Sequence, residues 1–139
     1  MSKVAVVYWS GTGNTEEMAN SVAAGAKKGG ADVTMFSASD FSAAKVAEFD
    51  GIAFGCPAMG AEQLEDSEFQ PMWDDVKGSL SGKKIGLFGS YDWGEGDWMT
   101  FWADDAAGAG VAISETVIAN NAPDAEAKAK CEALGTMLA

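Results

Sequence analysis

The sequence contains no histidine, and basic residues are scarce. Nine lysine and arginine side chains stand against 21 aspartate and glutamate side chains, so the 139-residue chain has a formal charge of -12. A histidine-ligated metal site and a histidine-based catalytic triad are therefore excluded. Nucleic-acid binding through the phosphates needs lysine and arginine, so the charge argues against that function as well. The acidic surface is expected to keep the protein soluble or to steer positively charged protein partners.

Cysteine and long apolar runs are also scarce. Cys56 and Cys131 lie far apart and form neither a CxxC redox motif nor a metal-ligand spacing. We expect both to be reduced, buried thiols. No run reaches the roughly 18 apolar residues of a membrane span, and no basic-then-apolar leader opens the sequence. We therefore expect a single cytoplasmic domain over residues 1–139, present as a monomer.

Apolar stretches alternate with helix-patterned stretches along the chain. The apolar runs cover residues 4–8, 33–36, 51–55, 84–89 and 113–119, and the helical patterns cover 13–28, 43–48, 68–77, 97–107 and 124–138. This alternation predicts an α/β fold with a parallel sheet and crossover helices. Because the strands read as continuous apolar runs, we expect them to be buried on both faces, in a three-layer α/β/α sandwich.

Capping residues support these helix boundaries. A Gly-Gly pair at residues 29–30 is predicted to end the first helix. Asp40 or Ser42 is predicted to cap the second helix, and a Pro-Asp pair at residues 123–124 to start the last one.

The turn after the first predicted strand has the composition of a phosphate-binding loop. Residues 8–16 read YWSGTGNTE and lead directly into the first predicted helix. Free N–H groups and the positive end of the helix dipole favour an anion there, and the glycines let the backbone approach it. Ser10, Thr12, Asn14 and Thr15 add uncharged donors. The loop lacks the lysine of a P-loop and the third glycine of a Rossmann fingerprint, which leaves an ordinary capped helix N-terminus as the alternative.

Two further loops follow the third and fourth predicted strands, where doubly wound sheets bind ligands. Residues 55–65 read GCPAMGAEQLE, and residues 89–98 read GSYDWGEGDW. Trp98 and Met99 are expected in the core. Trp93 is expected to stack on a ligand, with Met59 on the opposite wall; the alternative is that both fill gaps between helices. The three loops would then supply one phosphate-binding loop and two walls. A planar heterocycle between the walls, attached to a phosphate, suits this arrangement, and flavin mononucleotide (FMN) is such a ligand.

Together the three loops resemble those of flavodoxins, in particular the short-chain type of anaerobic bacteria. The matching segments are residues 9–16, 55–60 and 86–94, in family order and at family spacing. The resemblance implies a flavodoxin-like α/β/α sandwich whose five-stranded parallel sheet has the order 2-1-3-4-5. It also implies one noncovalently bound FMN and no metal. The function implied is low-potential one-electron transfer between redox protein partners, using the semiquinone and hydroquinone states, without substrate turnover.

The resemblance also implies a set of cofactor-binding residues and their roles. Residues 10–15 match the phosphate loop, Met59 the residue on one flavin face and Trp93 the aromatic residue on the other. Gly60 matches a glycine whose peptide reorients on reduction to accept a hydrogen bond from flavin N5, and Glu62 matches the carboxylate that meets N3–H. The full set is Ser10, Gly11, Thr12, Gly13, Asn14, Thr15, Pro57, Ala58, Met59, Gly60, Ala61, Glu62, Ser90, Tyr91, Asp92, Trp93 and Gly94.

Two positions depart from the family pattern. Ala61 stands where relatives often carry aspartate or serine, and Asp92 stands where glycine is common. We expect the peptide before Gly60 to stabilise the neutral semiquinone, because glycine lets it flip without a Cβ clash. Asp92, Glu62 and the phosphate should disfavour the reduced anion, because no lysine or arginine in these loops offsets them.

Three other functions use a related fold. An FMN-dependent quinone or nitro reductase needs a second substrate pocket and usually longer loops or a dimer interface. A signalling receiver domain needs acidic residues after strand one and an aspartate after strand three, where this chain has Ser10-Gly11 and Pro57-Ala58. A domain that has lost FMN is opposed by the intact loops.

Overall fold

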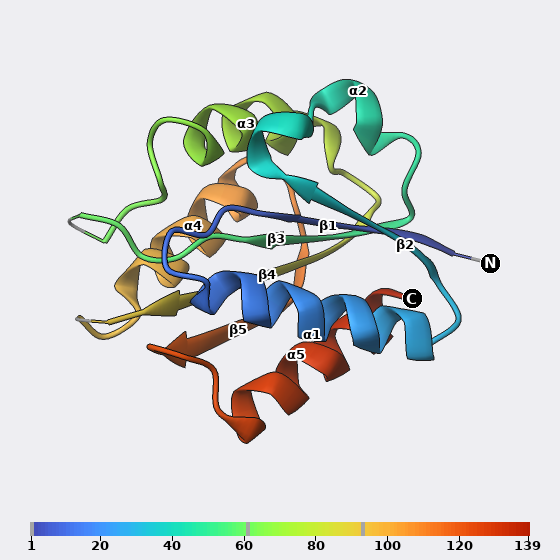
Figure 1. Ribbon diagram of the computed structural model, residues 1–139. Coiled ribbons are helices and arrows are strands. Elements are labelled where there is room, and N and C mark those ends of the chain that lie inside the picture. The colour runs from blue at the N-terminus through green and yellow to red at the C-terminus, as the bar shows by residue number, and fades with distance from the viewer. Residues whose placement is uncertain (1, 61, 93) are drawn as a thin grey trace.

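Five parallel strands form the central sheet of the protein. The computed structural model describes residues 2–60, 62–92 and 94–139. The strands are β1 (Lys3–Tyr8), β2 (Asp32–Ser37), β3 (Gly51–Gly55), β4 (Lys84–Tyr91) and β5 (Ile113–Asn120). Their order in the sheet is β2-β1-β3-β4-β5 and every pairing is parallel, which confirms the predicted topology. All carboxyl ends of the strands consequently lie at one edge (Figure 1).

Helices cover both faces of this sheet. They are α1 (Asn14–Lys28), α2 (Ala43–Val46), α3 (Phe69–Val76), α4 (Asp97–Gly108) and α5 (Ala125–Leu138), with short 3-10 turns η1 (Ala38–Asp40) and η2 (Lys77–Ser79). One buried cluster joins α1 and α5 to the sheet, and a second, rich in aromatic residues, joins α2, α3 and α4 to its other face. The predicted three-layer sandwich is confirmed.

Most helix boundaries follow the sequence signals. Gly30, just beyond α1, has φ +91°, and the Asp124 side chain accepts a hydrogen bond from Ala127 N at 2.8 Å at the start of α5. Ser42 is the N-cap residue of α2, as predicted, but its side chain accepts no cap hydrogen bond. Instead, Ala43 N donates to Asp75 Oδ2 at 3.0 Å. A side chain 32 residues away in the sequence supplies this acceptor, so the local pattern could not reveal it.

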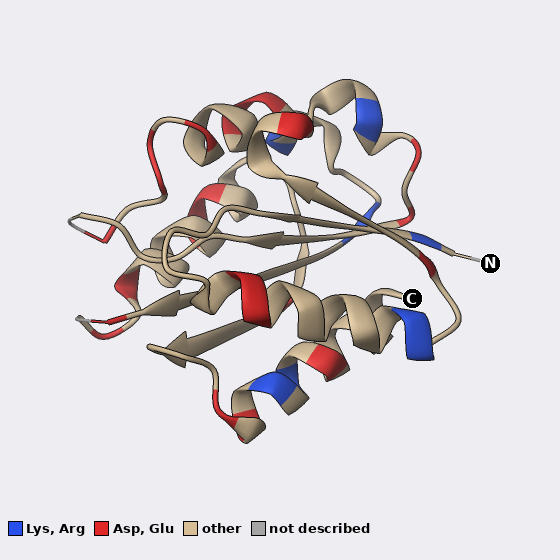
Figure 2. Ribbon diagram, in the orientation of Figure 1, with Lys and Arg blue, Asp and Glu red and all other residues tan. Residues whose placement is uncertain are grey.

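Charge is unevenly distributed along the strand direction. Acidic residues predominate in the loops at the carboxyl ends of the strands, whereas lysines lie mainly toward the opposite end and along α5 (Figure 2). The loops of residues 9–13, 56–68 and 92–96 contain no lysine or arginine. The carboxyl ends of the strands, where parallel sheets bind ligands, are therefore surrounded by negative charge.

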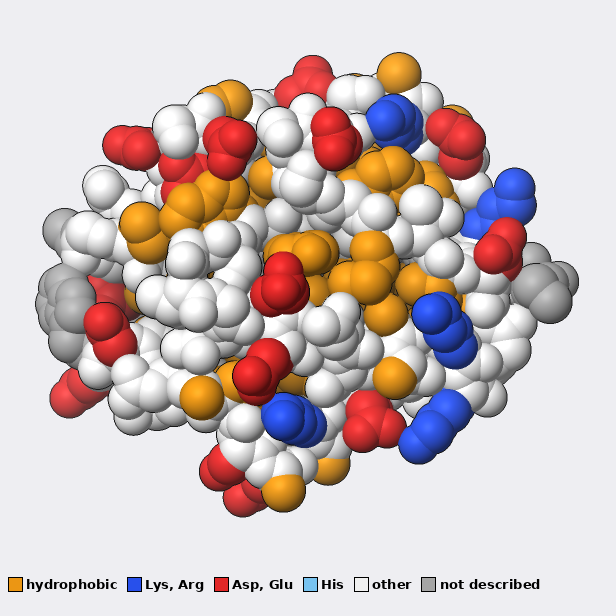
Figure 3. Space-filling model, viewed as in Figure 1, with side chains coloured by type: hydrophobic (Ala, Val, Ile, Leu, Met, Phe, Trp, Pro, Cys, Tyr) orange, Lys and Arg blue, Asp and Glu red, His pale blue; other side chains and the backbone are white. Residues whose placement is uncertain are grey.

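The two outer strands are more exposed than expected. β3 is buried along its whole length, but β2 alternates between exposed and half-buried residues, and much of β5 is exposed. The expectation of burial on both faces is thus wrong for these edge strands. Met35 of β2 is 37% exposed, and apolar side chains gather along β2 between α1 and α2 (Figure 3). Lys45 partly covers Phe36, with its Nζ 5.2 Å from the ring centroid.

Both cysteines are buried and free, as expected. Burial raises the pKa of Cys56 and of Cys131 to about 12, so neither forms a thiolate at neutral pH. Among the described residues, no helix has the length and apolar character needed to cross a bilayer.

Candidate functional site

The loop between β1 and α1 folds around a serine side chain. Ser10 Oγ accepts hydrogen bonds from Gly13 N at 3.1 Å and Glu16 N at 3.3 Å. Gly13 is the N-cap of α1 and has φ +97°, a conformation that a residue with a Cβ rarely adopts. Ser10 therefore shapes the loop as an acceptor, whereas the sequence suggested it as a direct donor to a ligand.

Several backbone donors of this loop remain available. Within the described part of the chain, five N–H groups find no acceptor: those of Ser10, Gly11, Thr12, Asn14 and Thr15. They stand at the N-terminal end of a 15-residue helix, where the helix dipole favours negative charge. This donor set carries no formal charge and suits a phosphate group.

A buried hydroxyl pair connects this loop to β4. Thr15 Oγ1 and Ser90 Oγ lie 3.3 Å apart, and the two residues are 1% and 5% exposed. Ala58 N donates to Ser90 O at 3.0 Å, which adds the loop after β3 to the same junction. Ser90, at the end of β4, therefore contacts both the start of α1 and the loop after β3.

The loop after β3 contains a tight hairpin. Met59 N donates to Gln63 O at 2.8 Å, and Gln63 N donates back to Met59 O at 2.9 Å. At the tip, Gly60 has φ +53°, and Glu62 has φ +59°, which is uncommon for a residue with a side chain. Met59 is 37% exposed, so the tip presents an apolar side chain to solvent.

Glu62 binds the start of α4. Its Oε2 accepts the Trp98 N–H at 2.7 Å, in the first turn of the helix. Gly94 makes room for this carboxylate, because an added Cβ would lie 2.0 Å from Glu62 Oε1. The Trp98 indole donates to Cys56 O at 3.1 Å, so Trp98 holds the loop after β3 at two points. Trp98 and Met99 are buried, as expected.

Glu65 fixes the far end of the same loop. Its carboxylate accepts backbone N–H groups from Ser67, Glu68 and Phe69 at 2.8 Å each, and it also accepts the Ser67 hydroxyl. Burial opposes ionisation of Glu65, but these hydrogen bonds prevail and lower its pKa to about 2. Trp9 Nε1 donates to Glu68 Oε2 at 2.8 Å, which ties the loop after β1 to the start of α3.

The three loops enclose a pocket of about 270 Å³ at the carboxyl edge of the sheet. The sequence-predicted residues that line it are Gly11, Thr12, Asn14, Pro57, Ala58, Met59, Ser90, Tyr91 and Asp92. The other described residues of the predicted set do not line it. Ser10 and Gly13 shape the turn, Gly60 lies at the hairpin tip, and Glu62 contacts α4. Ala61 and Trp93 lie outside the described residues.

Two lining residues were missed from the sequence. Trp9 lies directly before the phosphate loop and Asn121 directly after β5, and both line the pocket. Asn121 has φ +57° and its N–H donates to Tyr91 O at 2.6 Å, so it closes the side next to β4. The Asn-Asn pair at residues 120–121 was the available signal, since asparagine tolerates this backbone conformation.

The pocket has the chemistry that a flavin phosphate requires. One end supplies uncharged N–H groups and hydroxyls, and Met59, Tyr91 and Trp9 supply apolar surface beside it. The described residues contain no cluster of three or more His, Cys, Asp or Glu side chains that could hold a metal ion. The residues that line the pocket therefore fit a flavin with a phosphate group.

Comparisons with known proteins agree with this geometry. Residues 6–135 match the family model described as Flavodoxin. The chain is 50% identical over 121 residues to a flavodoxin of Megasphaera elsdenii. The aligned region covers 87% of this chain and 88% of that protein. It is 44% identical over 135 residues to a flavodoxin of Clostridium beijerinckii, covering 96% and 97%. The solution structure of two-electron reduced Megasphaera elsdenii flavodoxin superposes with a TM-score of 0.89 at 46% identity, covering 98% and 99%.

Proposed function

The chain belongs to the flavodoxin family, and from that premise we propose that it binds FMN noncovalently in the pocket lined by residues 9, 11, 12, 14, 57–59, 90–92 and 121. Flavodoxins are flavin-containing electron carriers, so the chain is an electron-transfer protein and not an enzyme that turns over a substrate. When bound, the flavin ring accepts and donates electrons one at a time.

The observation that carries the proposal for FMN is the set of free N–H groups at the start of α1. A phosphate dianion gains charge-assisted hydrogen bonds from them without a lysine or arginine to neutralise it. The neighbouring walls of the pocket are apolar, which suits a ring system. An adenine dinucleotide would need a second phosphate site, and the loop lacks the motif for one.

Residues beside the pocket are expected to set the redox behaviour. The backbone at Gly60 already has a positive φ, and an added Cβ there would meet nothing within 4 Å. Rotation of the peptide before Gly60 would break the hydrogen bond from Gln63 N to Met59 O and let that carbonyl accept a flavin N–H in its place. Asp92 lines the pocket, and no basic residue of the three loops offsets its carboxylate. Its field disfavours added negative charge and keeps the reduction potential low.

The proposal extends to partners and location. Redox partners that present positive charge would approach the acidic loops at the carboxyl ends of the strands, which Figure 2 shows in red. Free buried thiols at Cys56 and Cys131 are consistent with a reducing cytoplasm. We propose a cytoplasmic monomer made of one domain over residues 1–139.

A visible absorption spectrum followed by a reductive titration tests this function. Purified protein mixed with FMN should show a flavin band shifted from that of free FMN, and dithionite should reduce it in two resolved one-electron steps. NADH or NADPH alone should not bleach the band. Rapid bleaching by a nicotinamide without a partner reductase would contradict the electron-carrier assignment, and an unshifted spectrum would contradict FMN binding.

A further inference from the structure

A second, larger cleft opens beside the proposed FMN pocket. It has a volume of about 410 Å³ and lies between the loop after β3 and helix α4. Leu64, Trp98, Phe101 and Trp102 provide its apolar lining. Phe101 is 59% exposed, which is a large exposed fraction for a phenylalanine side chain.

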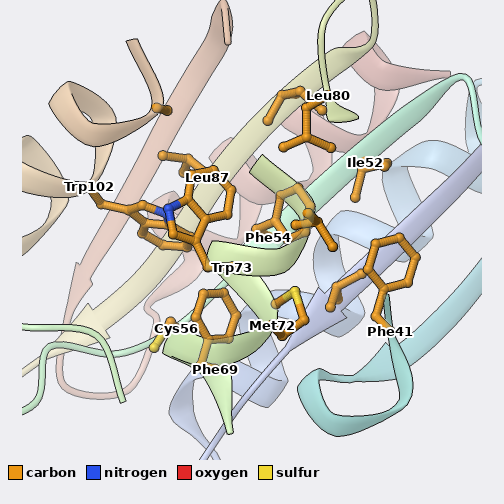
Figure 4. Close-up of a cluster of buried hydrophobic side chains, with 14 of the residues drawn as sticks. Phe41, Ile52, Phe54, Cys56, Phe69, Met72, Trp73, Leu80, Leu87 and Trp102 are labelled. Carbon is orange, nitrogen blue, oxygen red and sulfur yellow. The ribbon is translucent and has the colours of Figure 1, made fainter. Parts of the chain in front are cut away.

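The apolar floor of this cleft is part of a buried aromatic cluster. Trp102 packs edge-on against Trp73 and Phe69, with ring centroids 5.7 and 5.3 Å apart and interplanar angles of 88° and 89°. Figure 4 shows Trp102 at the side of this aromatic stack. Trp102 Nε1 is buried and, among the described residues, has no hydrogen-bond partner. This N–H is not exposed to the cleft, so the Trp102 ring contributes apolar surface there.

Carboxylates stand around the cleft. Among the described residues, the hydrogen bond that Glu62 accepts comes from the neutral Trp98 N–H, and Asp66 is exposed. Asp105 accepts from Trp73 Nε1 at 2.8 Å and lies 3.0 Å from Lys77 Nζ. Burial opposes ionisation of Asp105, but the bonds from Trp73 and Lys77 prevail and hold its pKa below the usual value. Lys77 neutralises part of this charge, and Glu62 and Asp66 leave the rim negative.

We propose that this cleft docks a lysine or arginine side chain from the redox protein partner. The aliphatic stem of such a side chain fits the apolar lining, and its cationic head meets the rim carboxylates. The exposed Phe101 ring adds cation–π attraction. A purely apolar occupant would leave the carboxylates desolvated and unpaired, and an acidic occupant would be repelled.

This docking site rests on the proposed function and adds a location to it. The loop after β3 lines both sites, because Met59 faces the FMN pocket and Leu64 faces the cleft. A partner anchored in the cleft is therefore held beside the pocket from which electrons leave. Phe101 would act as the apolar contact around which the two surfaces close.

Charge reversal at two sites distinguishes docking in the cleft from general electrostatic attraction by the acidic surface. Asp66→Lys alters the rim, and Glu126→Lys makes the same charge change at the start of α5, on the opposite face of the sheet. Phe101→Ala removes the apolar contact without changing charge. FMN affinity is measured first and should be unchanged in all three variants, since none of these residues lines the FMN pocket.

The rate of electron transfer from the reduced protein to cytochrome c, a lysine-rich haem protein, is then measured at low ionic strength. Asp66→Lys should lower the second-order rate constant about tenfold and Phe101→Ala about threefold, whereas Glu126→Lys should change it by less than about twofold. In parallel, titration with oxidised cytochrome c should shift the indole N–H resonances of Trp98 and Trp102.

If Asp66→Lys and Glu126→Lys lowered the rate constant equally, or if Phe101→Ala kept the wild-type rate constant, the cleft would not be a docking site. The partner would then be attracted only by the overall negative charge. Unshifted indole resonances would lead to the same conclusion. Loss of FMN binding by the wild-type protein would instead overturn the proposed function, and the indole titration would still be readable in the flavin-free chain.

Discussion

Replacing Gly94 by alanine should uncouple the loop after β3 from helix α4. The added Cβ would lie 2.0 Å from Glu62 Oε1, so the carboxylate must leave the place from which it accepts the Trp98 N–H. Gly94 also has φ +85°, which costs about 1–2 kcal/mol for a residue with a Cβ. Loss of a hydrogen bond to a charged acceptor adds about 1.5–3 kcal/mol. The free energy of unfolding should fall by about 3–5 kcal/mol.

Gly82 provides a matched control for this substitution. Its φ is +83°, and an added Cβ there would meet nothing within 4 Å. Gly82→Ala should therefore show only the backbone cost of about 1–2 kcal/mol. Urea titrations of FMN-free Gly94→Ala and Gly82→Ala compare the two directly. In a Glu62→Ala background the clash is absent, so the two glycine substitutions should then cost the same.

The reasoning fails if Gly94→Ala is no more destabilising than Gly82→Ala in the otherwise wild-type chain. That result would mean that the Glu62 carboxylate does not sit at the start of α4. A difference that persists in the Glu62→Ala background would show that Gly94 matters for another contact.

Three further substitutions probe the field and the loop. Gly60→Ala should lower the potential of the first electron by about 40 mV, the equivalent of one neutral hydrogen bond of about 1 kcal/mol, and an unchanged potential would argue against the peptide rotation. Asp92→Gly should raise the potential of the second electron by some tens of millivolts in a spectroelectrochemical titration; a fall would show that the local field has the opposite sign. Glu65→Gln should destabilise the protein by roughly 2 kcal/mol at pH 7. Because the pKa of Glu65 is lowered from 4.5 to about 2, its stabilisation is present above pH 4.5 and disappears as the pH falls through about 2, so the wild-type advantage in urea titrations should shrink over that window. An advantage that is constant down to pH 2 would contradict it.

The sequence predicted the strands and their order well, because each apolar run is bounded by glycine or polar residues and each helix has a periodic apolar face. It overstated burial at the sheet edges. Val33 and Phe36 are as apolar as residues of β3, but β2 has a neighbouring strand on one side only, and no pattern within residues 32–37 records that.

Long-range contacts limited the prediction of the site. The phosphate loop was recognised because its glycines and hydroxyls are contiguous. The contact of Glu62 with Trp98, 36 residues later, depends on how two loops meet, and so does the cleft between Leu64 and Phe101. Asn121 was missed because it reaches the pocket through the pairing of β5 with β4 and the bond from its N–H to Tyr91 O, and no local pattern in residues 113–121 records that pairing.

The binding of FMN compared with riboflavin tests the central claim most directly, because the two differ only in the phosphate. If two or more N–H groups at the start of α1 hold that phosphate, they contribute at least about 3 kcal/mol, and FMN should bind at least roughly a hundredfold more tightly. Fluorescence quenching titrations of the flavin-free protein measure both affinities. Equal affinities for FMN and riboflavin would contradict the assignment of residues 10–15 as a phosphate site.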